Sequence, residues 1–148
     1  MQSFLALHLS VFLVSGCATV WTEVPFVPTP MEVVDRMLEL AQVSGRDVVY
    51  DLGSGDGRVV IRAAKKHGAR GVGVEIDPEL VRVSRDNARK EGVDHLVEFC
   101  EQDALTVDLS RATVVTLYML PEFNAKLRPI LERDLRPGSR VVSHDFPV

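Results

Sequence analysis

Three glycines on alternate positions, Gly53, Gly55 and Gly57, stand between an apolar, β-prone run at residues 48–52 and an apolar pattern with helical spacing. Glycine lets a backbone turn sharply and approach a ligand with no Cβ atom in the way. The apolar run is what a strand covered on both faces requires. The segment therefore predicts a strand, a glycine loop that includes Ser54, and a helix, which together form a cradle for a nucleotide-like ligand.

The spacing of the glycines and the acid before them favour one ligand class. Dinucleotide-binding loops follow G-x-G-x-x-G, whereas this loop is G-x-G-x-G and follows Asp51. A carboxylate at that position repels a pyrophosphate but suits an ammonium group. S-adenosylmethionine, which has an α-amino group, a sulfonium and no phosphate, fits better than NAD, and a nicotinamide-dependent oxidoreductase is disfavoured. No G-K-[ST] follows, which excludes a Walker loop.

Two further acids end apolar, strand-like runs. Glu75 lies in residues 71–77, 24 positions after Asp51, and we expect it to accept hydrogen bonds from both ribose hydroxyls while Ile76 lies along the adenine. Asp103 ends the run at residues 97–103. It is predicted to accept the exocyclic amine of the adenine, with the backbone of Ala104 beside it.

The elements around these residues predict one α/β domain. Alternating strands and helices indicate a Rossmann-like, doubly wound, mostly parallel sheet of order 3-2-1-4-5, in which ligands bind outside the carboxyl ends of the strands. We expect helices to begin at a Thr29 capping box and after Asp77, and to stop near Gly68 and Gly92. The remaining predicted elements are a strand at 112–120, a helix at 121–135 broken at Pro129, and a strand at 140–146.

Length and charge narrow the class further. With 148 residues and 46% hydrophobic content, the chain can bury one core. The formal net charge of −4 gives no broad basic face, so a nucleic-acid partner is not expected. Neither Cys17 nor Cys100 has neighbours at metal-ligand spacing, and no metal site is predicted.

Residues 25–147 resemble the class I (seven-strand) S-adenosylmethionine-dependent methyltransferases. More narrowly, five segments resemble one subgroup of this family: PFVPTP (25–30), YDLGSGDGR (50–58), GVGVEID (71–77), TVVTLYMLPEFN (113–124) and RVVSHDF (140–146). It contains the protein-lysine methyltransferases that act on mitochondrial ATP synthase c-subunits and the adenine nucleotide carrier, with bacterial relatives. It is similar in turn to the histone lysine methyltransferases without a SET domain.

The resemblance implies a methyl acceptor and residues that position it. The acceptor would be a protein lysine, which can belong to a membrane-embedded substrate. The alternative acceptor is a small molecule. In related amine methyltransferases, polar or aromatic residues after the fourth strand align the acceptor nitrogen, so Tyr118 and Asn124 are candidates. Packing within the strand for Tyr118, and an exposed position on the helix for Asn124, are equally open alternatives. In the related enzymes the segment before the first helix folds over the methionine end of the cofactor, which gives Thr29 a second interpretation as part of a lid.

The two ends of the chain raise separate expectations. Residues 1–24 form a hydrophobic segment, and residues 1–22 contain no Asp, Glu, Lys or Arg. We expect residues 4–20 to anchor the enzyme at a membrane facing the cytosol; an exported lipoprotein processed at Cys17 is the alternative. The methyltransferase domain, 25–148, is expected to be truncated after its fifth strand, so a cofactor-binding fragment without catalysis is a further alternative.

Overall fold

The computed structural model describes residues 26–148. The hydrophobic segment at 1–24, the proposed anchor at 4–20, the lipoprotein position Cys17 and the first proline of the lid, Pro25, lie outside the described residues. Among the helices of the described part, none is long and apolar enough to cross a bilayer.

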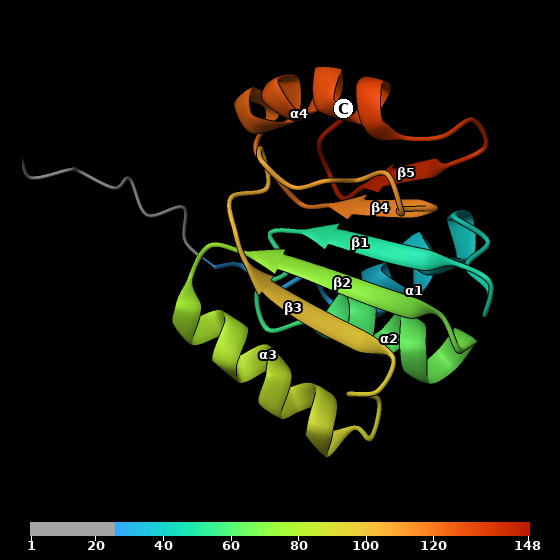
Figure 1. Cartoon of the computed structure of the whole chain (residues 1–148), viewed down its shortest axis with the longest axis vertical. Helices are drawn as coiled ribbons and strands as arrows, with labels where there is room; N and C mark the ends of the chain where they lie inside the picture. The colour runs from blue at the N-terminus through green and yellow to red at the C-terminus, as the bar shows by residue number, and fades with distance from the viewer. Residues whose placement is uncertain (1–25) are drawn as a thin grey trace, which may run out of the picture.

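Five parallel strands form one sheet in the order β3-β2-β1-β4-β5 (Figure 1). This order confirms the predicted doubly wound fold. The strands, in chain order, are β1 (Val48–Leu52), β2 (Arg70–Glu75), β3 (Val97–Glu101), β4 (Val114–Leu117) and β5 (Arg140–Ser143). Because all five run the same way, their carboxyl ends meet at one edge of the sheet and their amino ends at the opposite edge.

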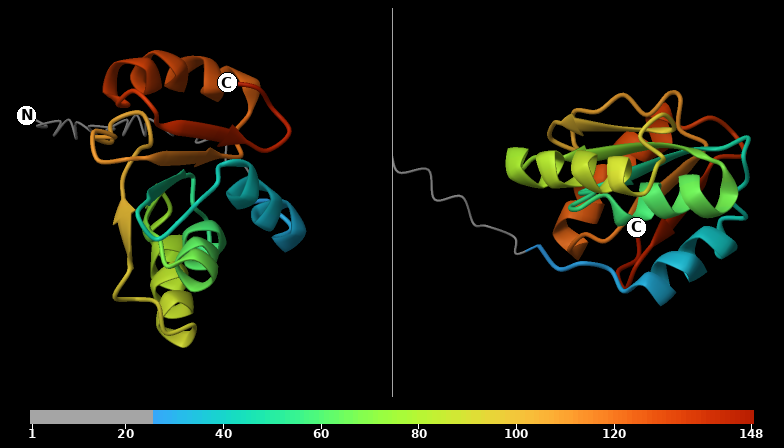
Figure 2. Two further views of the ribbon diagram at one scale, coloured as in Figure 1. Left: turned by 90° about the vertical axis from the view of Figure 1, so that its right-hand side faces the viewer. Right: turned by 90° about the horizontal axis from the view of Figure 1, so that it is seen from below.

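Four helices cover the two faces of the sheet (Figures 1 and 2). A first apolar core joins one face to α1 (Met31–Leu40), α2 (Arg58–His67) and α3 (Pro78–Lys90). A second core packs α4 (Pro121–Asp134) and the chain between β3 and β4 against the other face. Alternate residues of β1 show why both faces are apolar, since Val49 belongs to the first core and Tyr50 to the second.

The strands are shorter than predicted. β2 ends at Glu75, and the Asp77 side chain instead accepts a hydrogen bond from the amide of Glu79, which confirms a helix start there. β3 ends at Glu101, so Asp103 lies in the following loop. The strand expected at 112–120 is limited to Val114–Leu117, and the one expected at 140–146 ends at Ser143.

Two helix predictions were wrong at prolines. The capping box fails because Pro30, extended at φ −56° and ψ 142°, is the residue before α1, and no side chain caps the helix. The helix begins one residue later than the motif predicts, so Thr29 precedes the capping position and its side chain does not cap the helix. The break at Pro129 is also wrong, because α4 continues to Asp134. Pro129 and Ala125 are both exposed, so water can bond the carbonyl that the proline leaves without a donor.

Candidate functional site

The glycine loop follows β1 and is held against β2 by main-chain bonds. The amides of Gly53 and Ser54 both donate to the Val74 carbonyl, at 2.8 and 3.0 Å. Gly55 has a φ of +54°, a conformation in which a side chain would be strained. A Cβ atom built on Gly55 would also lie 2.1 Å from the ring of Phe26. The loop therefore needs glycine at this position for its conformation and because the Phe26 ring lies against it.

Glu75 ties the end of β2 to this loop. One carboxylate oxygen accepts the amide of Gly55 at 2.8 Å, and the other accepts the amides of Ile76 at 2.8 Å and Asp77 at 3.0 Å. The side chain is buried, and charge-assisted bonds of this kind are stronger than neutral ones. Glu75 thus fixes the loop in addition to any bonds that it makes to a ribose, which stay a prediction.

Asp51 lies at the end of β1 with its carboxylate buried. Burial raises the pKa of Asp51 to about 7, although the Thr116 hydroxyl donates a hydrogen bond of 2.7 Å that favours the charged form. The negative charges of Glu75 and Asp56 raise this pKa further. Asp51 is therefore a carboxylate that gains from a cation placed next to it.

Sequence reasoning missed Thr116. In β4 this residue stands directly opposite Asp51, and it is fully buried. The available signal was a single hydroxyl within an otherwise apolar run, in the strand that neighbours β1 in the predicted order. A buried hydroxyl needs a partner, and Asp51 is that partner.

The residues assigned to the adenine lie at neighbouring strand ends. Ile76 directly follows β2, and 57% of its surface is exposed, as a platform for a flat ring would be before the ligand covers it. The amide of Gln102 donates to the Glu75 carbonyl at 2.9 Å, which holds the start of the next loop beside β2. In that loop Asp103 is exposed and accepts the amide of Leu105, while Ala104 is buried. The roles of Ile76, Asp103 and Ala104 toward adenine remain predictions.

Ser54 acts through its backbone in this structure. Its hydroxyl oxygen is buried, has no hydrogen-bond partner among the described residues, and lies 2.7 Å from where a Cβ atom on Gly73 would stand. The hydroxyl thus faces β2 and the amide fixes the loop.

The chain before α1 lies against the glycine loop. The Arg58 guanidinium donates to the Thr29 carbonyl at 2.9 Å and pairs with Asp56 of the loop at 2.6 Å. Thr29 is 8% exposed. Phe26 extends over Gly55, as described above, and is a contact that sequence reasoning did not identify. This placement is compatible with a lid that includes Thr29.

Tyr118 and Asn124 follow β4 but are engaged differently. The ring of Tyr118 packs on the His144 ring, with centroids 4.1 Å apart and planes tilted by 36°. Asn124 is 1% exposed, and its amide group donates to the carbonyls of Phe146 and Pro147 at 3.3 and 3.2 Å. Asn124 is thus buried in α4 rather than exposed. The carbonyl oxygen of the Asn124 side chain has no hydrogen-bond partner among the described residues. The role of Asn124 toward an acceptor stays a prediction.

Acidic groups dominate the carboxyl edge of the sheet. Five segments directly follow the strands, and none of them contains lysine or arginine. Four of them, 53–57, 76–77, 102–106 and 144–148, contain an acid, whereas 118–120 contains none. Asp51 and Glu75 add two buried carboxylates at the strand ends. Such an edge attracts cations and repels phosphate groups.

These features fit S-adenosylmethionine. The buried carboxylate of Asp51 suits its ammonium group, and the exposed apolar surface of Ile76 suits its adenine. The bonds of Glu75 to its ribose stay a prediction. When bound, the cofactor supplies an electrophilic methyl group. The protein residues described here bind and orient; none is a nucleophile.

Known proteins support the same conclusion from sequence. The family described as "ANTKMT methyltransferase domain" matches residues 51–148. The protein-lysine N-methyltransferase of Saccharolobus islandicus is 50% identical over 126 residues, which cover 84% of this chain and 78% of that protein. The lysine N-methyltransferase of Xenopus laevis named for the ATP synthase c-subunit is 38% identical over 83% of this chain and 54% of its own length. The chain thus spans about half the length of that relative.

Solved structures agree. A protein described as an RNA methyltransferase from Salinibacter ruber, in complex with S-adenosyl-L-homocysteine, is 66% identical with a TM-score of 0.81; the match covers 82% of this chain and 79% of that one. An S-adenosylmethionine-dependent methyltransferase from Geobacter sulfurreducens, also with S-adenosyl-L-homocysteine, is 28% identical with a TM-score of 0.67, over 78% of this chain and 47% of that one. Together with the cradle described above, these matches show that the chain belongs to the ANTKMT methyltransferase-domain family of S-adenosylmethionine-dependent methyltransferases.

Proposed function

We propose that this methyltransferase acts on the ε-amino group of a lysine in a protein. The observation that carries the proposal is the acidic carboxyl edge, because a lysine is drawn to it as a cation. The names of the relatives from Saccharolobus islandicus and Xenopus laevis support the same acceptor class. The lysine must lose a proton before its nitrogen lone pair forms the new C–N bond as the C–S bond breaks.

Apolar side chains after β4 favour that proton loss, whereas the acids of the edge favour the charged lysine that first arrives there. Leu120 is 50% exposed at the start of α4, and Met119 packs against the glycine loop, where a Cβ atom on Gly53 would lie 2.4 Å from its terminal carbon. An ammonium group that leaves water for such surroundings favours its neutral form. Catalysis would then come mainly from positioning, and Tyr118 is the residue that we propose to contact the acceptor.

RNA is the competing acceptor, because the Salinibacter ruber protein is described as an RNA methyltransferase. The charge of the site argues against it here. A phosphate chain that places a base at the cofactor must pass the segments 53–57, 76–77, 102–106 and 144–148, which carry only acids among their charged groups apart from His144. We therefore favour lysine.

One labelling experiment separates the acceptors. The protein is incubated with S-adenosylmethionine labelled in the methyl group, together with protein, RNA and small-molecule fractions of the host cell. We expect protease-sensitive label, and methyl-lysine in the labelled protein by mass spectrometry. Label that only a ribonuclease releases would assign RNA, and label confined to small molecules would assign a metabolite. Cofactor binding by calorimetry with no label in any fraction would assign a binding module. The variant Gly55→Val is the inactive control.

We also propose that residues 4–20 hold the enzyme at a membrane with its catalytic domain in the cytosol. The support is the absence of charged residues from 1–22 and the cytosolic origin of S-adenosylmethionine. Fractionation and protease accessibility test this arrangement. Complete protection of the domain in intact spheroplasts agrees with it, whereas digestion there would favour the lipoprotein alternative at Cys17.

A further inference from the structure

The amino edge of the sheet, opposite the cofactor site, carries an arginine or a histidine before or at the start of each strand. In sheet order these residues are His95 before β3, Arg70 at the start of β2, Arg46 before β1, Arg111 before β4 and Arg136, four positions before β5. The first residue of β5 is Arg140, which pairs with Asp47 and is not counted in this row. All five are exposed. Neighbouring strands lie about 4.8 Å apart, so the row extends for about 19 Å across the sheet.

The arginines of this row differ from the others in the described chain by having no partner. Within residues 26–148, Arg46, Arg70, Arg111 and Arg136 form no ion pair, and their guanidinium groups donate no hydrogen bond. Every other arginine there does one or the other. Within the described residues, the arginines without an ion pair or a side-chain hydrogen bond are therefore the four of this row.

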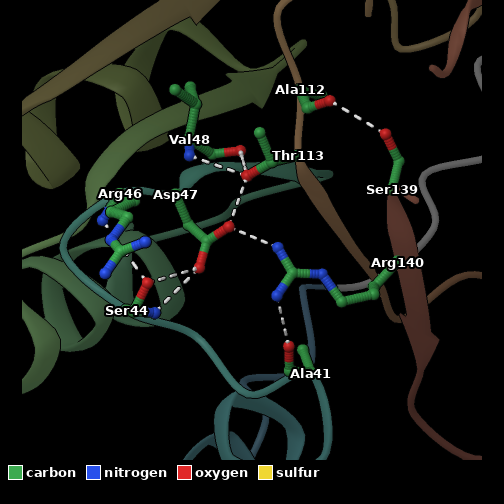
Figure 3. A network of polar contacts seen from close by, with 9 residues as sticks. All are labelled: Ala41, Ser44, Arg46, Asp47, Val48, Ala112, Thr113, Ser139 and Arg140. Atoms are coloured by element: carbon green, nitrogen blue, oxygen red, sulfur yellow. Dashed lines mark hydrogen bonds and ion pairs between the residues drawn. The ribbon is translucent and has the colours of Figure 1, made fainter. Parts of the chain in front are cut away.

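The nearest acid on this edge does not neutralise the row. Asp47 is 6% exposed and accepts hydrogen bonds from the Thr113 hydroxyl and the Ser44 amide, at 2.7 and 2.8 Å, and it pairs with Arg140 (Figure 3). Burial alone would raise the pKa of Asp47, but these bonds and the Arg140 charge together hold it below its ordinary value. Asp47 is thus charged and already compensated.

Part of the row is hollowed. A shallow cleft of about 270 Å³ is lined by Arg70, Arg111 and His95, together with Glu98 and residues at the amino ends of β1, β2 and β3. Asp94, Glu98 and Asp108 are exposed acids near the row, and hydrogen bonds from Ser110, followed by the charge of Arg111, contribute to lowering the pKa of Asp108. The free arginines outnumber these acids, so the edge keeps a positive balance.

We propose that this amino edge binds the phosphate backbone of a single-stranded nucleic acid. Guanidinium groups match phosphate oxygens in pairs, and a line of them at regular spacing suits a linear chain of phosphates. The row contains no Phe, Tyr or Trp on which bases would stack, so the contact is chiefly to the backbone and binding depends little on sequence. The nucleic acid is a docked partner at the edge remote from the cofactor, not the methyl acceptor.

This proposal departs from the expectation drawn from net charge. A net charge of −4 excludes a basic surface only if the charges are evenly spread, and here acids gather at the carboxyl edge while unpaired arginines gather at the other. An anionic membrane is a poorer occupant, because Phe26 contacts Gly55 and the chain toward residues 1–25 therefore joins the domain at the carboxyl edge. An acidic protein surface is tested below.

The test measures binding of a labelled oligouridylate of about 15 nucleotides to the full chain by fluorescence anisotropy over a range of salt concentrations. Four phosphate contacts predict a slope of log K against log salt of about −3, at about 0.7 per contact for a single strand. In the double variant Arg70→Gln/Arg111→Gln the slope should halve, to about −1.4. Oligothymidylate should bind in the same way, since the contacts are to phosphates.

The matched control is Arg128→Gln, which removes one exposed arginine whose partner is Glu132 on α4. It should leave binding and slope unchanged, and calorimetry should show the same S-adenosylmethionine affinity in all three proteins. Absence of oligonucleotide binding would overturn the proposal, as would an affinity unchanged in the double variant. Binding of polyglutamate or of anionic lipid vesicles without binding of the oligonucleotides would also overturn it and assign the edge to those partners.

Discussion

Replacing Asp51 by Asn should stabilise the ligand-free protein while weakening its binding of the cofactor. The folded protein holds the pKa of Asp51 at about 7 instead of 3.8, chiefly through burial. At 1.36 kcal/mol for each tenfold change in acidity, this difference corresponds to about 4 kcal/mol of destabilisation once the buried carboxylate is charged. Asparagine keeps the size and the acceptor oxygen for the Thr116 hydroxyl but carries no charge.

The pH dependence follows from the direction of the shift. Below about pH 4 the Asp51 carboxyl is protonated in both the folded and the unfolded protein, so it makes no difference to stability there. Between pH 4 and 7 the unfolded chain loses the proton first, and the wild-type protein loses stability relative to Asp51→Asn. Above about pH 7 the difference is constant and largest.

Urea unfolding of the wild type and of Asp51→Asn, measured from pH 4 to pH 9, gives this difference directly. We expect the variant to gain up to about 4 kcal/mol at pH 8 and its S-adenosylmethionine affinity to fall by about 10- to 100-fold, as loss of a charged hydrogen-bond partner predicts. A variant less stable than the wild type at pH 8, or a difference that does not change between pH 4 and 7, would refute the electrostatic account of Asp51.

Three other substitutions test the site and its support. Glu75→Gln replaces an acceptor of three backbone amides, so calorimetry should show S-adenosylmethionine affinity lowered by about 10- to 100-fold; unchanged affinity would contradict the assignment. Gly55→Val meets the Phe26 ring and a φ of +54°, and we expect no measurable cofactor binding by a chain that is still folded by circular dichroism. Arg140→Gln leaves Asp47 buried without its cation and should cost about 2 kcal/mol in urea unfolding at pH 7. Because the pKa of Asp47 is lowered in the folded state, that loss should fade as the pH drops below 4.

The parts of the site that could be predicted are those formed by residues close together in the sequence. The glycine loop, the acid before it and the acid that ends β2 each follow an apolar run, so their places at strand ends depend only on recognising the strands. The order of the sheet then brings Asp51 and Glu75 to one edge. That order follows from topology that alternating strands and helices already indicate, and at this edge Glu75 accepts the Gly55 amide.

The contacts that could not be predicted join residues far apart in sequence. Thr116 bonds Asp51 across 65 positions, and Phe26 meets Gly55 from a chain that has no regular structure. Nothing in the local pattern specifies such pairs. The error at Pro129 has another origin. The rule that a proline breaks a helix does not take into account that water can bond the carbonyl that the proline leaves without a donor.

The opposite charges of the two edges follow from the polarity of a parallel sheet. Along the sequence, acids tend to come just after the strands and arginines just before them, and this alternation averages to a small net charge. In an antiparallel sheet the same alternation would mix both signs at each edge, because successive strands reverse. Here all five strands run the same way, so the sheet converts an order along the chain into a separation in space. The two proposed partners would then bind at opposite edges of the sheet. The lysine acceptor would meet the acids of the carboxyl edge, and the nucleic acid would meet the arginines of the amino edge.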